Sequence, residues 1–141
     1  AEVVFRLICV AEGAEPEELL SEYADILSVA VTADVMPLKG ENRSIVKDGI
    51  KKLKSAPSAG LSAIMSVAGI KCGDINASRI AFGIAPRINA AGRLGNADIA
   101  FRLLTTDNES EALKLAKRID ELNTERRETE NEIFILPPKR K

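Results

Sequence analysis

Residues 80–96, which read IAFGIAPRINAAGRLGN, run from the end of one predicted helix through a predicted loop to the start of the next helix. This stretch holds Arg87, Asn89 and Arg93 among small residues, and it contains no acidic side chain. Small residues let a backbone approach a ligand closely, and the arginine guanidinium is a planar charged fork that suits phosphate oxygens. We interpret the stretch as a place where a phosphate backbone lies. The alternative is an ordinary turn between helices with a solvated rim of arginines.

Proline and candidate caps set the predicted helix boundaries around this stretch. We expect Asn76 or Ser78 to cap a short helix that Pro86 ends. A loop is predicted over residues 87–96, followed by a helix that runs through Leu104.

Upstream, apolar residues recur at helical spacing. They predict a helix over residues 17–32 that ends before Pro37, a second over 42–55 and a third over 60–70. The apolar block over residues 3–10 fits a buried helix or a strand, because periodicity alone does not separate the two.

The predicted last helix is long and changes character along its length. It is capped by Asn108 or Ser110 and carries an apolar stripe as far as Leu122. Residues 123–132 are then all polar or charged, which is typical of a helix that bridges two domains through solvent. Arg126 and Arg127 could face the cleft between those domains, although mixed charge on a helix is usually only solvated.

The helix predicted over residues 42–55 carries three lysines at helical spacing. Lys47, Lys51 and Lys54 lie opposite its apolar residues. A solvated face is the ordinary explanation, and a track for a nucleic-acid backbone is the alternative.

Composition limits the chemistry that the chain can perform. It has 141 residues, a net charge of −1, two cysteines and no histidine. This length suits one domain, and the charge excludes a uniformly basic nucleic-acid binder, so any such contact must be local. The absence of histidine excludes Ser–His and Cys–His nucleophile pairs and histidine metal sites within the chain. We expect Cys9 and Cys72 to be buried thiols.

No apolar run approaches the roughly 20 residues that a membrane span needs. The first ten residues also lack the basic region of a signal peptide. We therefore expect a cytoplasmic protein without a membrane partner.

Asp34 falls near the C-terminal end of the helix predicted over residues 17–32. The helix dipole concentrates partial negative charge there, so the carboxylate needs compensation. The residues alone suggest that Asp34 caps the following loop or pairs with Lys39 or Arg43.

Three blocks in order resemble the RecJ family, the single-strand-specific DNA exonucleases of the DHH phosphoesterase superfamily. They are VTADVMPLKGENR at 31–43, PRINAAGRLG at 86–95 and LNTERRETE at 122–130. The resemblance implies a mainly α fold, the helical C-terminal part of a DHH-type α/β catalytic domain over residues 1–107, followed by a long connecting helix over 108–133. The Asp-His-His run that names the superfamily is absent from this sequence. Residues 134–141 depart from the family and are taken as a truncation or foreign remainder.

The resemblance also implies an activity and its residues. It implies part of a metal-dependent 5′-to-3′ exonuclease that hydrolyses single-stranded DNA in repair and recombination with Mn²⁺ or Mg²⁺. Asp34 resembles a catalytic metal ligand of the family. Arg93, Asn89 and Arg87 resemble residues that contact substrate phosphate, with Arg87 as a structural brace for the loop in the alternative interpretation.

We expect this segment to be inactive alone, because one acidic ligand does not hold a metal pair. Its expected partners are single-stranded DNA and the rest of the parent polypeptide, with self-association through bare apolar surface. Two alternatives remain open. One is another DHH phosphoesterase acting on oligonucleotides or cyclic dinucleotides, which should lack the PRINAAGR block. The other is a non-catalytic nucleic-acid-binding scaffold.

Overall fold

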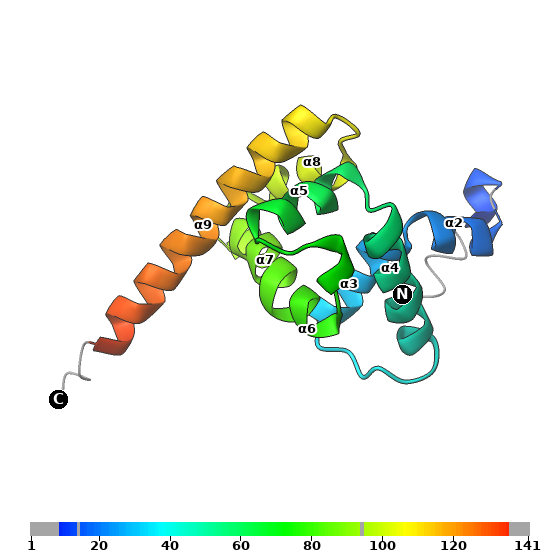
Figure 1. The fold of residues 1–141 in the computed structure, drawn as a ribbon, viewed down its shortest axis with the longest axis horizontal. Helices are drawn as coiled ribbons and strands as arrows, with labels where there is room; N and C mark the ends of the chain where they lie inside the picture. The colour runs from blue at the N-terminus through cyan, green and yellow to red at the C-terminus, as the bar shows by residue number, and fades with distance from the viewer. Residues whose placement is uncertain (1–8, 14, 94, 136–141) are drawn as a thin grey trace.

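The computed structural model describes residues 9–13, 15–93 and 95–135 (Figure 1). These residues form helices and connecting turns without any strand, so the predicted mainly α fold is confirmed. The block over residues 3–10 lies almost wholly outside the described residues. The elements in chain order are α2 (Pro16–Glu22), α3 (Ala24–Ala33), α4 (Gly40–Ser55), α5 (Ala59–Val67), a 3₁₀ turn (Cys72–Asp74), α6 (Ala77–Arg79), a π-helical turn (Ile80–Ile84), α7 (Ala85–Arg93), α8 (Ala97–Thr105) and α9 (Glu109–Ile135).

One apolar core holds the helices together. Helix α9 packs along α5, α7 and α8, and its far end projects away from the bundle (Figure 1). Complete burial of a leucine or isoleucine side chain stabilises a fold by about 1.5–3 kcal/mol. The fully buried large aliphatic side chains are Leu53, Leu61, Ile64, Ile75, Ile80, Ile84, Leu103 and Ile119.

The apolar stripe of α9 ends where the sequence predicts. Ile119 and Leu122 are buried, whereas residues 127–131 are exposed. The helix predicted over residues 108–133 is therefore confirmed, since α9 runs from Glu109 to Ile135, while its role as a connection between domains stays a prediction. No helix in the described ranges is long and apolar enough to cross a membrane.

The single helix predicted over residues 17–32 is wrong, because the chain breaks at Tyr23 into α2 and α3. Helix α3 is held close to α4, since a Cβ on Gly49 would lie 2.2 Å from the Cβ of Ser28. Helix α2 buries no residue. The core therefore holds α3 but not α2. The two helices meet at Tyr23, whose φ and ψ are −104° and 14°.

The loop predicted over residues 87–96 is also wrong for most of its length. Residues 77–93 form one helical run, in which the π-helical turn precedes α7. The N–H of Ala85 donates to the carbonyl of Ile80, five residues back. This wider turn comes just before Pro86, which lies in the first turn of α7, where its missing N–H and fixed φ are tolerated. The sequence-based prediction treated Pro86 only as a helix terminator.

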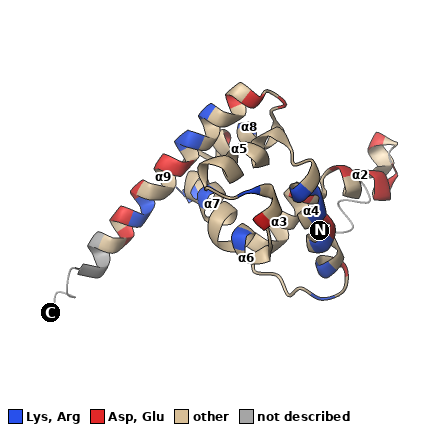
Figure 2. Cartoon of the chain, in the orientation of Figure 1, with Lys and Arg blue, Asp and Glu red and all other residues tan. Residues whose placement is uncertain are grey.

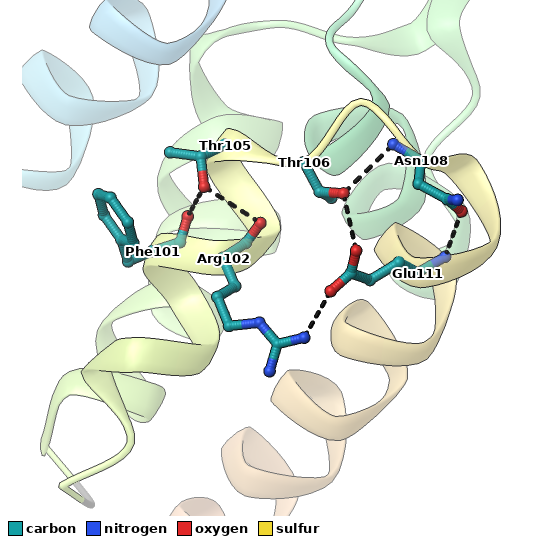
Figure 3. A network of polar contacts seen from close by, with 6 residues as sticks. All are labelled: Phe101, Arg102, Thr105, Thr106, Asn108 and Glu111. Carbon is teal, nitrogen blue, oxygen red and sulfur yellow. Dashed lines mark hydrogen bonds and ion pairs between the residues drawn. The ribbon is translucent and has the colours of Figure 1, made fainter.

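Side-chain caps fix the ends of two helices. Asn76 caps α6 by accepting a hydrogen bond from the N–H of Arg79 at 2.9 Å, as predicted. At the start of α9, the side chain of Asn108 accepts from the N–H of Glu111 at 3.0 Å, which confirms the Asn108 cap (Figure 3).

A polar network joins α8 to α9 beside the Asn108 cap. The Glu111 carboxylate accepts hydrogen bonds from the Arg102 guanidinium at 2.5 Å and from the Thr106 hydroxyl at 3.1 Å (Figure 3). These bonds favour the ionised carboxyl, so they hold the pKa of Glu111 below its usual value, with Arg102 the larger cause. The network ties Arg102 of α8 to Glu111 in the first turn of α9.

The two cysteines differ in environment. Cys9 is buried, as predicted, but Cys72 is exposed and its predicted burial is wrong. Cys72 lies in the 3₁₀ turn, where Ile70 and Ile75 on either side occupy the core positions.

A candidate phosphate-binding cleft

An open cleft of about 620 Å³ lies between α3, the π-helical turn, α7 and α9. The end of α3 and the following loop form one wall, and residues 77–93 supply the opposite one. Helix α9 contributes the side chain of Arg126. The cleft therefore brings together segments of all three sequence blocks that resemble the RecJ family.

Asn89 and Arg93 lie on the face of α7 that lines the cleft. They are four residues apart on the helix, so their side chains are neighbours. Both are exposed. Within the described residues, Arg93 has no hydrogen-bond or ion-pair partner, and its guanidinium is therefore available to an external anion.

Arg87 lies on the other side of α7, outside the cleft. Its Nε donates to Oδ1 of Asp120 on α9 at 2.7 Å, and its Nη1 donates to the carbonyl oxygen of Gly83 at 2.6 Å. The side chain is only 18% exposed. This geometry favours the alternative interpretation, in which Arg87 is a structural brace, here between α7 and α9.

Asp34 is the C-cap residue of α3 and is exposed at the rim of the cleft. Its neighbours Ala33 and Val35 line the cleft, whereas Asp34 itself does not. Across the described ranges its carboxylate pairs with no cation, including Lys39 and Arg43, and accepts no hydrogen bond. The negative end of the α3 dipole thus carries an uncompensated carboxylate.

The backbone immediately after Asp34 is strained. Val35 has φ +53° and a side chain that is 87% exposed. A left-handed conformation is unusual for a β-branched residue, and such a conformation costs about 1–3 kcal/mol. No burial of the Val35 side chain offsets this cost.

The residues of the described ranges do not form a metal site by themselves. They contain no group of three histidine, cysteine, aspartate or glutamate side chains placed to hold an ion. Mn²⁺ and Mg²⁺ require several oxygen ligands. Asp34 could supply one of these, and we assign no catalytic step to a metal held by this chain alone.

Two cleft residues are clear only in the structure. Phe82 lines the cleft with its ring 83% exposed. Arg126 donates to Glu130 at 2.8 Å and to the Asn123 side chain at 3.4 Å, but its buried Nε has no partner among the described atoms. The sequence suggested Arg126 only together with Arg127, in a helix segment of mixed charge, and it gave no signal for Phe82 beyond an aromatic residue among small ones.

No family model matches the chain. Among curated proteins it is similar to the single-stranded-DNA-specific exonucleases RecJ of Bacillus subtilis, 38% identical over 124 residues, of Thermus thermophilus, 43% over 118 residues, and of Escherichia coli, 36% over 117 residues. These alignments cover 88%, 82% and 82% of this chain but only 15%, 17% and 20% of the relatives. The chain thus spans about a fifth or less of their length.

Solved structures give the same result. The crystal structure of RecJ from Thermus thermophilus in complex with Mn²⁺ matches with a TM-score of 0.79 and 38% identity, covering 93% of this chain and 20% of that one. The Mg²⁺ complex matches with a TM-score of 0.77 and 39% identity, covering 89% of this chain and 19% of that one. In sequence and in fold, the chain therefore corresponds to one segment of the proteins of the RecJ family.

Proposed function

We propose that the cleft seats a phosphate of single-stranded DNA in a metal-dependent 5′-to-3′ exonuclease of the RecJ type, of which this chain forms one part. The observation that carries the proposal is the convergence of Asn89, Arg93 and Arg126 on one open cleft. Among the described residues the exposed guanidinium of Arg93 has no partner, and Arg126 brings a second guanidinium to the cleft, where it also donates to Glu130. The curated relatives are named single-stranded-DNA-specific exonucleases, which supports DNA as the phosphate source.

In this proposal Arg93 and Asn89 stabilise the negative charge of the bound phosphate. Arg93 donates to the non-bridging oxygens of the phosphate, and Asn89 adds an amide donor beside it. Hydrolysis places further negative charge on those oxygens, and removal of one preorganised donor from an oxyanion hole costs about 10²–10³ in rate. The Phe82 ring offers a flat surface on which a base stacks.

Asp34 supplies one ligand from the rim toward a divalent cation whose other ligands come from outside the described residues. Related structures contain Mn²⁺ and Mg²⁺. When bound, such an ion polarises a phosphoryl oxygen and activates water. The unpaired carboxylate of Asp34 at the end of α3 fits this role, because a cation would offset its repulsion from the helix dipole.

The test is to measure, by fluorescence anisotropy and without metal, how tightly the chain binds a 5′-phosphorylated oligothymidylate. Arg93→Gln removes a charge-assisted hydrogen bond worth about 1.5–3 kcal/mol, so we expect affinity to fall about 10-fold or more. The matched control is Arg79→Gln, because Arg79 is exposed on α6 outside the cleft. Equal effects of the two substitutions would refute the assignment of the cleft as the phosphate site.

A further inference from the structure

A second basic surface runs along α4. Arg43, Lys47 and Lys54, here called the α4 basic stripe, lie four and then seven residues apart on this helix. At about 100° per residue they fall within about 40° of one another around the helix axis. Figure 2 shows basic residues recurring along α4.

The charge of the α4 basic stripe is not cancelled locally. All three side chains are exposed, and none has an ion-pair or hydrogen-bond partner in the described part of the chain. The acidic residues of α4, Glu41 and Asp48, lie about 140–160° around the helix from Arg43. Asp48 pairs instead with Lys51, at 2.9 Å.

The α4 basic stripe borders a hollow that has one lining residue in common with the phosphate-binding cleft. The hollow measures about 440 Å³, and Leu38, Val46 and Ile50 give it apolar walls. Leu38 also lines the phosphate-binding cleft. Leu38 therefore belongs to the lining of both hollows.

We propose that the α4 basic stripe binds the sugar-phosphate backbone of single-stranded nucleic acid that passes over Leu38 from the phosphate-binding cleft. This inference rests on the proposed function, since it extends the same bound strand. Arg43 and Lys54 are eleven residues apart, which is about 16 Å along the helix, so the surface is long enough for more than one phosphate. The apolar walls accept bases, and the unpaired cations release counterions when they meet phosphates. An acidic protein surface would use the cations but would not explain continuity with the cleft.

The experiment measures binding of oligothymidylates of about 4 and about 16 nucleotides to the 141-residue chain between about 50 and 200 mM salt. The stripe variant carries Arg43→Gln, Lys47→Gln and Lys54→Gln. The control variant carries Lys71→Gln, Lys114→Gln and Lys117→Gln, which removes the same charge from exposed positions outside both hollows.

We expect the stripe variant to lose affinity for the longer strand while binding the shorter strand as the unmodified chain does. Three lost phosphate contacts lower the slope of log affinity against log salt by about 2 for single strands, so the advantage of the unmodified chain should shrink about 20-fold across this salt range. The control variant should keep the original slope. Lys54→Gln alone, expected to change the slope by about 0.7, provides a minimal variant if the triple variant loses helicity by circular dichroism.

An unchanged slope in the stripe variant would overturn this inference and leave the cleft assignment intact, provided that Arg93→Gln still weakens the shorter strand. If the stripe variant loses the binding to polyglutamate that the unmodified chain shows, and still binds the longer strand as the unmodified chain does, the surface is assigned to an acidic protein and this inference is also overturned. If Arg93→Gln leaves both strands unaffected, the proposed function itself fails.

Discussion

The ion pair between Arg87 and Asp120 offers a direct test of how the cleft is held together. It joins α7, which carries Asn89 and Arg93, to α9, which carries Arg126. If Arg87 is a brace, its loss and the loss of Asp120 should have similar consequences. If Arg87 instead binds phosphate, only its own loss should weaken DNA binding.

The expected size of the effect follows from burial. The Arg87 side chain is 18% exposed and the Asp120 side chain 35%, with Nε and Oδ1 2.7 Å apart. Exposed pairs are worth about 0.2–1 kcal/mol, and hydrogen bonds to charged groups about 1.5–3 kcal/mol. For this half-buried pair we expect a coupling energy of about 1–2 kcal/mol. Arg87→Gln should cost more than Asp120→Asn, because it also removes the hydrogen bond to the Gly83 carbonyl.

The assay is a double-mutant cycle with Arg87→Gln, Asp120→Asn and the double variant, using denaturant unfolding for stability and oligothymidylate anisotropy for binding. For a brace, we expect both single variants to weaken binding, and the double variant to be no weaker than Arg87→Gln. A different pattern would refute the reasoning, namely weaker binding in Arg87→Gln together with unchanged or tighter binding in Asp120→Asn. Asp120→Asn frees the guanidinium and removes a negative charge, so a phosphate-binding Arg87 would gain from it.

Two further predictions concern the fold. A Cβ on Gly60 would lie 1.9 Å from the backbone oxygen of Leu103, so Gly60→Ala should push α5 from α8 and destabilise the chain by about 1–3 kcal/mol in a denaturant titration. A Cβ on Gly92 of α7 would meet nothing within 4 Å, so Gly92→Ala should stabilise the chain by about 0.5–1 kcal/mol in the same titration. Equal changes in the two variants would contradict the close packing of α5 on α8. The lowered pKa of Glu111 means that its carboxylate stabilises the fold above its usual pKa of 4.5 and that this contribution is lost as pH falls through the lower pKa of the folded state. Glu111→Gln should therefore be less stable than the unmodified chain at about pH 7, with the difference vanishing in acid, and a difference that does not change with pH would refute it.

Much of the architecture is visible in the sequence because it depends on local chemistry. The polar tail of α9 follows from the end of its apolar stripe at Leu122, and its start follows from the Asn108 cap. The break at Tyr23 is different, because no proline or glycine marks it; α3 packs against Gly49 of α4, whereas α2 buries no residue. That contact joins residues far apart in the chain, and no local pattern in α2 or α3 reveals it.

The candidate site was predicted in part. Asn89 and Arg93 lie together in the cleft, and Asp34 lies at its rim between two lining residues. Phosphate and metal binding by these residues stay predictions. Arg126 could not be assigned from the sequence, because the same mixed-charge pattern appears on any solvated helix. Its position depends on α9 packing against α7.

The separation of Arg87 from Arg93 shows what a single wrong boundary conceals. In a loop, two arginines six residues apart have no fixed relation, and the family resemblance implies phosphate contact for both, with Arg87 as a brace in the alternative interpretation. On a helix, six residues correspond to about 240° of rotation, whereas the four residues from Asn89 to Arg93 correspond to about 40°. Helical geometry therefore places Arg93 beside Asn89 and turns Arg87 toward Asp120, as the structure shows. The information was present in the sequence, and treating Pro86 as the end of a helix, when it occupies the first turn of one, prevented its use.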